Sequence, residues 1–111
     1  MSNTPAKSFN ERLNEWDEED LRTILKTKWG RRFVWRFMSR CGIFSQSFVP
    51  DDPYATAFNE GRRSVGNTLL KQVIDINPEA YILMTKAAKK EEEYGRQLEP
   101  KPEPDESEST D

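Results

Sequence analysis

The chain has 111 residues and a net charge of −3, and it contains one cysteine and no histidine. This length allows one small domain, and the cysteine and histidine counts exclude an internal disulfide framework and a structural zinc site. The N-terminus lacks the apolar stretch of a signal peptide, and no run approaches about 18 apolar residues, so we expect an intracellular protein that spans no membrane.

The charged residues are unevenly distributed. Residues 21–50 carry seven bases and no acid, whereas residues 1–20 carry two bases and six acids. Residues 96–111 hold two bases, six acids and three prolines, with Leu98 as their only large apolar side chain. Because this composition buries too little apolar surface to offset the entropy of ordering, residues 96–111 are predicted to form a disordered acidic tail.

The remaining boundaries follow from the same distribution. Residues 1–14 are polar and are predicted to be a flexible N-terminal segment, which leaves residues 15–95 as the folding unit. A core of that size rarely supplies more than about 3–5 kcal/mol without help. A protein partner or a homo-oligomer is therefore expected on energetic grounds.

The first predicted helix begins at Asp17, a suitable N-cap that is followed by three further acids favourable to the helix dipole. Leu21, Ile24, Leu25 and Trp29 then recur at helical spacing and share one face.

The second helix is predicted to run from a Thr27 cap to Cys41, with Gly42 at the C′ position. About half of its circumference is apolar, as a core-facing helix needs. The residues expected in the core are Trp29, Phe33, Val34, Phe37, Met38 and Cys41. Cys41 is interpreted as a small core residue, because no activating base for a nucleophile can be identified.

The third helix is predicted to begin at an Asp52 cap, with Pro53 in the first helical position. Interior glycines cost about 1 kcal/mol each relative to alanine, so Gly61 and Gly66 favour close approach of another helix. The neighbours of Gly61 predict an arginine–carboxylate pair between helices, formed from Glu60, Arg62 and Arg63. The apolar stripe of this helix consists of Tyr54, Phe58, Gly61, Val65, Leu69, Val73 and Ile76.

A fourth helix is predicted from the Asn77 cap through Pro78 to Gly95. Its apolar stripe is formed by Tyr81, Met84, Ala87 and Ala88. No segment alternates with the period of two that marks a strand. The expected fold class is therefore all-α, with four helices making up the α-helical domain over residues 15–95.

The connection between the second and third helices, "GIFSQSFVP", is strongly apolar for a loop. Ile43, Phe44, Phe48 and Val49 could cap the core of the helical domain. Alternatively, they could form a docking surface, since exposed apolar patches mark interaction sites.

The basic block places Arg32, Arg36 and Arg40 in an i, i+4 row, with Arg31 nearby. Like charges at this spacing are mildly unfavourable, so a compensating acidic group is expected. The candidates within the chain are Glu15, the four acids at 17–20 and the acidic tail.

Trp35 lies outside the expected core arc and has two interpretations. It could belong to a wide buried face or stack beneath an arginine, or it could anchor an interface, since Trp and Arg dominate binding hot spots. We predict a partner-binding set consisting of Arg31, Arg32, Trp35, Arg36, Phe44 and Phe48.

Nucleic acid is the alternative partner of a basic block with interleaved aromatic residues. The acidic overall balance opposes it, because a dedicated binder has a clearly basic domain, so an acidic protein surface is preferred. Catalysis is not expected, because the chain has no histidine for serine–histidine chemistry and no glycine-rich phosphate loop. No metal and no cofactor are implied.

Several short motifs occur together in this chain: "GRR" at 30–32, "WR" at 35–36, "RCGIF" at 40–44, "FNEGRR" at 58–63 with Gly66 and Leu69, and "PEAY" at 78–81. In this combination, residues 21–84 resemble a family of small proteins from short-tailed bacteriophages, first named from a Bordetella phage. The chain departs from the family at Lys28–Trp29, where the second helix of the relatives usually begins near a proline. The additional aromatic residue makes a partner contact possible there.

The resemblance implies a non-enzymatic role in virion structure or assembly, because the family members are usually encoded among capsid, portal and tail genes. It implies capsid, portal or tail proteins as partners, and a location in the virion or in the host cytoplasm during assembly. A nucleic-acid-binding accessory protein in genome packaging or ejection is the alternative function.

Overall fold

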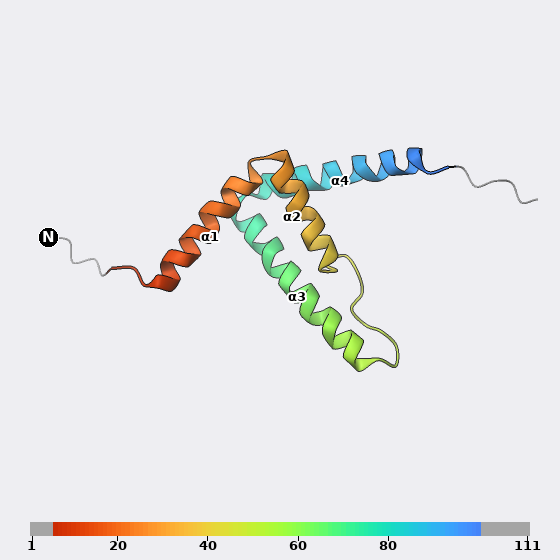
Figure 1. Ribbon diagram of the computed structural model, residues 1–111, viewed down its shortest axis with the longest axis horizontal. Helices are drawn as coiled ribbons and strands as arrows, with labels where there is room; N and C mark the ends of the chain where they lie inside the picture. Colours follow the sequence, from red (N-terminus) through yellow and green to blue (C-terminus); the bar gives the residue numbers. More distant parts are fainter. Residues whose placement is uncertain (1–5, 101–111) are drawn as a thin grey trace, which may run out of the picture.

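The computed structural model describes residues 6–100, which form four helices and no strand. The helices are α1 (Phe9–Leu25), α2 (Lys28–Arg40), α3 (Pro53–Ile76) and α4 (Pro78–Leu98), as Figure 1 shows. The predicted all-α class is therefore confirmed. Within this range, no helix is both long enough and apolar enough to cross a membrane.

Three predicted helix starts are confirmed by side-chain caps. Thr27, Asp52 and Asn77 each accept a hydrogen bond from the backbone N–H three residues further on, at 2.9, 2.9 and 3.1 Å. Each bond satisfies an amide that the first turn of a helix otherwise leaves without a partner. After α2, Gly42 adopts a φ of 80°, the left-handed conformation of a C′ glycine.

The predicted start of the first helix at Asp17 is wrong. α1 begins at Phe9, because Ser8 supplies an earlier N-cap and accepts a hydrogen bond from the backbone N–H of Glu11 at 3.2 Å. Residues 9–14 of the predicted flexible segment are therefore helical. Residues 1–5 lie outside the described part of the chain.

The predicted end of the fourth helix at Gly95 is also wrong. α4 continues through Gly95 to Leu98. Gly95 does not adopt the positive φ with which Gly42 follows the end of α2, so it remains an interior helical residue. Residues 96–98 of the predicted tail are helical, and residues 101–111 lie outside the described range.

The hydrophobic core lies at one junction where parts of all four helices meet (Figure 1). Leu25 of α1, Met38 of α2 and Val73 of α3 are its most completely buried large side chains. The rest of the core comes from the same ends of the helices and from the residue after Gly42, namely Leu21, Val34, Ile43, Ala80 and Met84. α2 lies at the centre of this arrangement and contacts α1, α3 and α4.

Away from the junction the helices diverge, and their outer halves carry exposed apolar side chains. Figure 1 shows α1 and α3 leaving the junction as two separate arms, with α4 running away on a third side. Phe9 and Trp16 on α1, Tyr54 and Phe58 on α3, and Tyr94 on α4 are all exposed. The core is therefore small relative to the apolar surface that remains in contact with solvent.

The glycines of α3 differ in their surroundings. A Cβ atom added to Gly66 would lie 2.6 Å from Cys41 Cβ and 2.6 Å from Ile43 Cγ2, whereas one added to Gly61 would meet nothing within 4 Å. The predicted close approach therefore occurs at Gly66, where α3 crosses the end of α2. It does not occur at Gly61, for which the prediction is wrong.

Candidate functional site

The solvent-facing side of α2 carries the aromatic residues that were expected in the core. Trp29, Phe33 and Phe37 are 68%, 67% and 42% exposed, whereas Val34, Met38 and Cys41 are buried. The core prediction is confirmed for the second group and wrong for the first. The reason is that the core occupies only the part of the wide apolar arc that contains Val34 and Met38.

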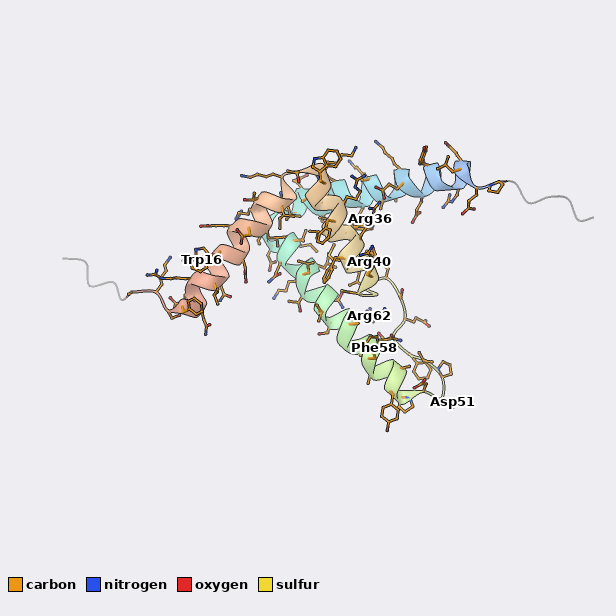
Figure 2. All side chains as sticks on the ribbon, viewed as in Figure 1. Trp16, Arg36, Arg40, Asp51, Phe58 and Arg62 are labelled. Carbon is orange, nitrogen blue, oxygen red and sulfur yellow. The ribbon has the colours of Figure 1, made fainter. Side chains whose placement is uncertain are left out.

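The same side of α2 carries the arginine row. Arg32, Arg36 and Arg40 each follow one of the exposed aromatic residues by three positions, so the two i, i+4 rows lie side by side on the helix. Figure 2 shows Arg36 and Arg40 one turn apart along α2. We call this surface the aromatic–arginine face of α2, and it consists of Trp29, Arg32, Phe33, Arg36, Phe37 and Arg40.

Within the aromatic–arginine face, an arginine and an aromatic ring already interact. The guanidinium carbon of Arg32 lies 5.4 Å from the ring centroid of Trp29, within the range of a cation–π contact. Trp29 is the residue at which the chain was expected to depart from its relatives. The contact holds an aromatic ring and a positive charge together at the start of α2.

The arginines of this face have no ion-pair partner among residues 6–100. The side-chain ion pairs in that range join Lys7 to Glu15 and Arg96 to Glu92. The prediction that Glu15 and the acids at 17–20 compensate the arginine row is therefore wrong. These acids lie on α1, and the residues of α1 that meet the core and the start of α2 are Leu21, Ile24 and Leu25.

Trp35 is oriented differently from the other aromatic residues of α2. It is partly buried against the core, and its ring centroid lies 5.1 Å from that of Phe44 and 6.3 Å from that of Tyr81. Of its two interpretations, the structure favours burial, because the buried face of α2 is turned toward Trp35 and away from Phe33 and Phe37. Trp35 thus connects α2 to the loop and to α4.

Arg31 also has a structural contact. Its Nη1 donates a hydrogen bond to the backbone carbonyl of Leu25 at 3.0 Å, and its side chain is partly buried. A positive charge next to the last carbonyl groups of a helix interacts favourably with the negative end of the helix dipole and stabilises the helix. Of the predicted partner-binding set, Arg31 and Trp35 therefore hold the fold together, whereas Arg36 is exposed on the aromatic–arginine face.

The apolar residues of the loop after α2 differ in burial, so only part of the loop caps the core. Ile43 is buried in the core, whereas Phe44 and Phe48 are exposed. The loop is held against α3, because Asn59 Nδ2 donates to the carbonyl of Ser47 at 3.1 Å and Val49 N–H donates to Thr56 Oγ1 at 2.9 Å. These bonds fix the backbone on both sides of Phe48, whose ring remains available for contact.

The predicted arginine–carboxylate pair on α3 is wrong for the described residues. Arg62 lies over the ring of Phe58, with the guanidinium carbon 5.9 Å from the centroid, and its Nη2 donates to Asn59 Oδ1 at 3.4 Å. Figure 2 shows Phe58 and Arg62 near each other on the outer half of α3. An arginine within cation–π distance of an exposed aromatic ring therefore occurs on both α2 and α3.

A groove of about 330 Å³ separates α2 from α4. Its apolar floor is formed by Trp35, Leu83, Met84, Ala87 and Ala88. Its charged residues are Lys28, Arg31, Arg32, Lys86, Lys90 and Glu91. The groove therefore combines an apolar floor with five bases and a single acid. It borders the aromatic–arginine face at Arg32 and was not expected from the sequence.

The described residues were searched for clusters of side chains that could hold a metal ion. No three Cys, Asp or Glu side chains in this part of the chain are placed to hold a metal ion. Cys41 is a free, buried thiol. The described surface presents exposed aromatic rings beside guanidinium groups.

The chain was compared with known proteins. The family model for Bbp19-like phage proteins matches residues 21–86, which is more than half of the 111 residues. The matched region contains α2 and α3 completely, the core end of α1 and the first half of α4. No curated protein and no solved structure matches the chain.

Proposed function

The chain belongs to the Bbp19-like phage protein family, and from that premise we propose that it is a non-enzymatic structural or assembly protein of the phage particle. It acts by protein–protein contact with capsid, portal or tail proteins. Its place of action is the virion, or the host cytoplasm while particles are assembled.

The observation that carries this proposal is the aromatic–arginine face of α2. Trp, Tyr and Arg are the residue types that most often dominate protein interfaces, and this face presents Trp29 and three arginines with two phenylalanines on one short helix. Its arginines have no acidic partner within residues 6–100. An acidic surface on another protein would complement both the charge and the rings.

The small core supports the same proposal on energetic grounds. Large apolar side chains are exposed on all four helices and in the loop at Phe44 and Phe48. Contiguous exposed apolar surface on a soluble protein usually marks an interaction site. A partner that covers part of this surface would add apolar burial that the isolated chain lacks.

Binding measurements with purified phage proteins test this proposal. We expect the double variant Phe33→Ala/Phe37→Ala to lose about 2 kcal/mol or more of binding energy to its capsid, portal or tail partner, as interface hot spots do. Tyr94→Ala is the matched control, because Tyr94 is an exposed ring on α4 away from this face. Equal affinity of the double variant, the control and the unchanged protein would contradict the proposal.

Nucleic acid is the second candidate partner, and the exposure of Trp29, Phe33 and Phe37 favours it more than the sequence did. Aromatic rings next to arginines can stack on bases while the guanidinium groups contact phosphates. This candidate predicts DNA binding whose logarithmic affinity falls with log salt at a slope of about −0.9 per phosphate contacted in a duplex. Absence of DNA binding at low salt would eliminate it.

A further inference from the structure

The groove between α2 and α4 has the properties of a binding site for an acidic segment. It is lined by five bases and by one acid, Glu91. No ion pair in the described range involves any of these six residues. Carboxylates bound there would form charge-assisted hydrogen bonds with lysine and arginine, which are stronger than hydrogen bonds between neutral groups.

The floor of the groove restricts the chemistry of the occupant further. It presents the partly buried ring of Trp35 beside Leu83 and Ala87. Grooves lined by aromatic side chains favour proline-rich segments, because an extended polyproline conformation loses little entropy on binding. In a segment that contains both carboxylates and prolines, the carboxylates could pair with the bases of the groove and the prolines could pack on its apolar floor.

Such a segment follows α4 in the same chain. Residues 99–111 have the sequence "EPKPEPDESESTD", with three prolines, six acids and one lysine. Their net charge of −5, from one base minus six acids, is opposite to that of the groove residues, which is +4 from five bases minus one acid.

The distances are compatible with a contact within one molecule. Leu98 is the last residue of α4, seven residues beyond Glu91, which corresponds to about 10 Å along the helix axis. The 13 residues after Leu98 can span at most about 43–47 Å when extended. A tethered segment of this kind acts at an effective concentration of about millimolar, so modest affinity is sufficient.

We propose that residues 99–111 bind back into the groove between α2 and α4 of the same molecule, with their carboxylates on the groove bases and their prolines against Trp35. The bound segment also neutralises Arg32, which belongs to both the groove and the aromatic–arginine face. The contact does not depend on which partner binds the aromatic–arginine face.

Fluorine NMR of the full chain, labelled with 5-fluorotryptophan, tests the contact. Three resonances arise from Trp16, Trp29 and Trp35, and single Trp→Phe variants assign them. Neutralising the segment by E103Q/D105N/E106Q/E108Q should shift the Trp35 resonance and leave that of Trp16 unchanged. The shift should be the same at low and high protein concentration and should disappear at high salt.

Reversing the charge of the groove provides the decisive comparison. In the K86E/K90E background, neutralising the segment should no longer shift the Trp35 resonance. K71E/K89E is the control with the same change in charge, since both lysines are exposed and lie outside the groove, and in that background the shift should persist. An unchanged Trp35 resonance, or equal shifts in both backgrounds, would overturn the proposal. A concentration-dependent shift would assign the segment to a neighbouring copy and would overturn the intramolecular contact.

Discussion

The rings of Trp35 and Tyr81 lie with their centroids 6.3 Å apart, and this contact joins α2 to α4 beside the core. Phe44 adds a third ring, whose centroid lies 5.1 Å from that of Trp35. Aromatic pairs at these separations contribute about 0.5–1.5 kcal/mol beyond the burial of their area. Trp35 is therefore a structural residue, whereas Trp29 on the same helix is exposed.

This difference predicts that two tryptophan substitutions affect stability to very different extents. Trp35→Ala should lower the free energy of unfolding by about 2–4 kcal/mol, because it leaves a cavity between Phe44 and Tyr81. Trp29→Ala should change it by no more than about 0.5 kcal/mol, as surface substitutions usually do. Urea denaturation followed by circular dichroism measures both values. Equal destabilisation by the two variants would contradict the orientation of α2, in which Trp35 is packed against the core and Trp29 is exposed.

The two glycines of α3 predict stability changes of opposite sign. Gly66→Ala should destabilise the fold by about 1–3 kcal/mol, because its Cβ would overlap Cys41 and Ile43. Gly61→Ala has free space and should stabilise it by up to about 1 kcal/mol, the difference in helix propensity. Thermal unfolding of the pair provides the measurement. A stabilising Gly66→Ala would contradict the close packing of α3 against the end of α2.

The cap of α2 provides a third prediction. Thr27→Ala removes the hydrogen bond to the N–H of Gly30 and should lower the free energy of unfolding by about 0.5–2 kcal/mol. Thr68→Ala is the control, because the Thr68 hydroxyl donates only to the Ser64 carbonyl within α3, and alanine is the better helix former there. Denaturant midpoints that move equally for both variants would be incompatible with a capping role of Thr27.

These stabilising contacts were not equally predictable from the sequence. The caps at Thr27, Asp52 and Asn77 could be predicted, because an N-cap depends only on residues that are close in sequence. The capping side chain accepts a hydrogen bond from a backbone N–H three residues further on. The N-cap at Ser8 was missed because acids from Asp17 onward make an equally plausible first turn. Local signals therefore identified the four helices but placed the start of the first one at Asp17 instead of Ser8.

The largest error of the prediction from sequence concerned which side of α2 is buried. Its cause lies in contacts between helices that are far apart in the sequence. A helical wheel fixes the relative directions of Val34, Phe33 and Trp35 but does not determine which part of a wide apolar arc meets other helices. α1, α3 and α4 all contribute buried side chains to the cluster that contains Val34 and Met38, and α4 also contacts Trp35 through Tyr81. One signal was present in the sequence, since Arg36 and Arg40 directly border the row of Phe33 and Phe37 and so place those rings at a solvated edge.

The candidate site was consequently predictable only in part. Arg32 and Arg36 could be selected from their spacing, and both lie on the aromatic–arginine face. The groove could not be predicted, because it depends on how α4 crosses α2. Its lysines at 86 and 90 are far from Arg31 in sequence and come together with it only in the fold.

Quantitative mass spectrometry of purified phage particles and assembly intermediates tests the central claim most directly, namely that the aromatic–arginine face of α2 binds a phage structural protein. The variant to measure is Arg36→Glu/Arg40→Glu, and Lys71→Glu/Lys89→Glu is the control with the same change in charge at other exposed positions. We predict that the arginine variant is folded but lost from the particles and intermediates, whereas the control is retained at the unchanged copy number. Retention of both variants at that copy number would contradict the account.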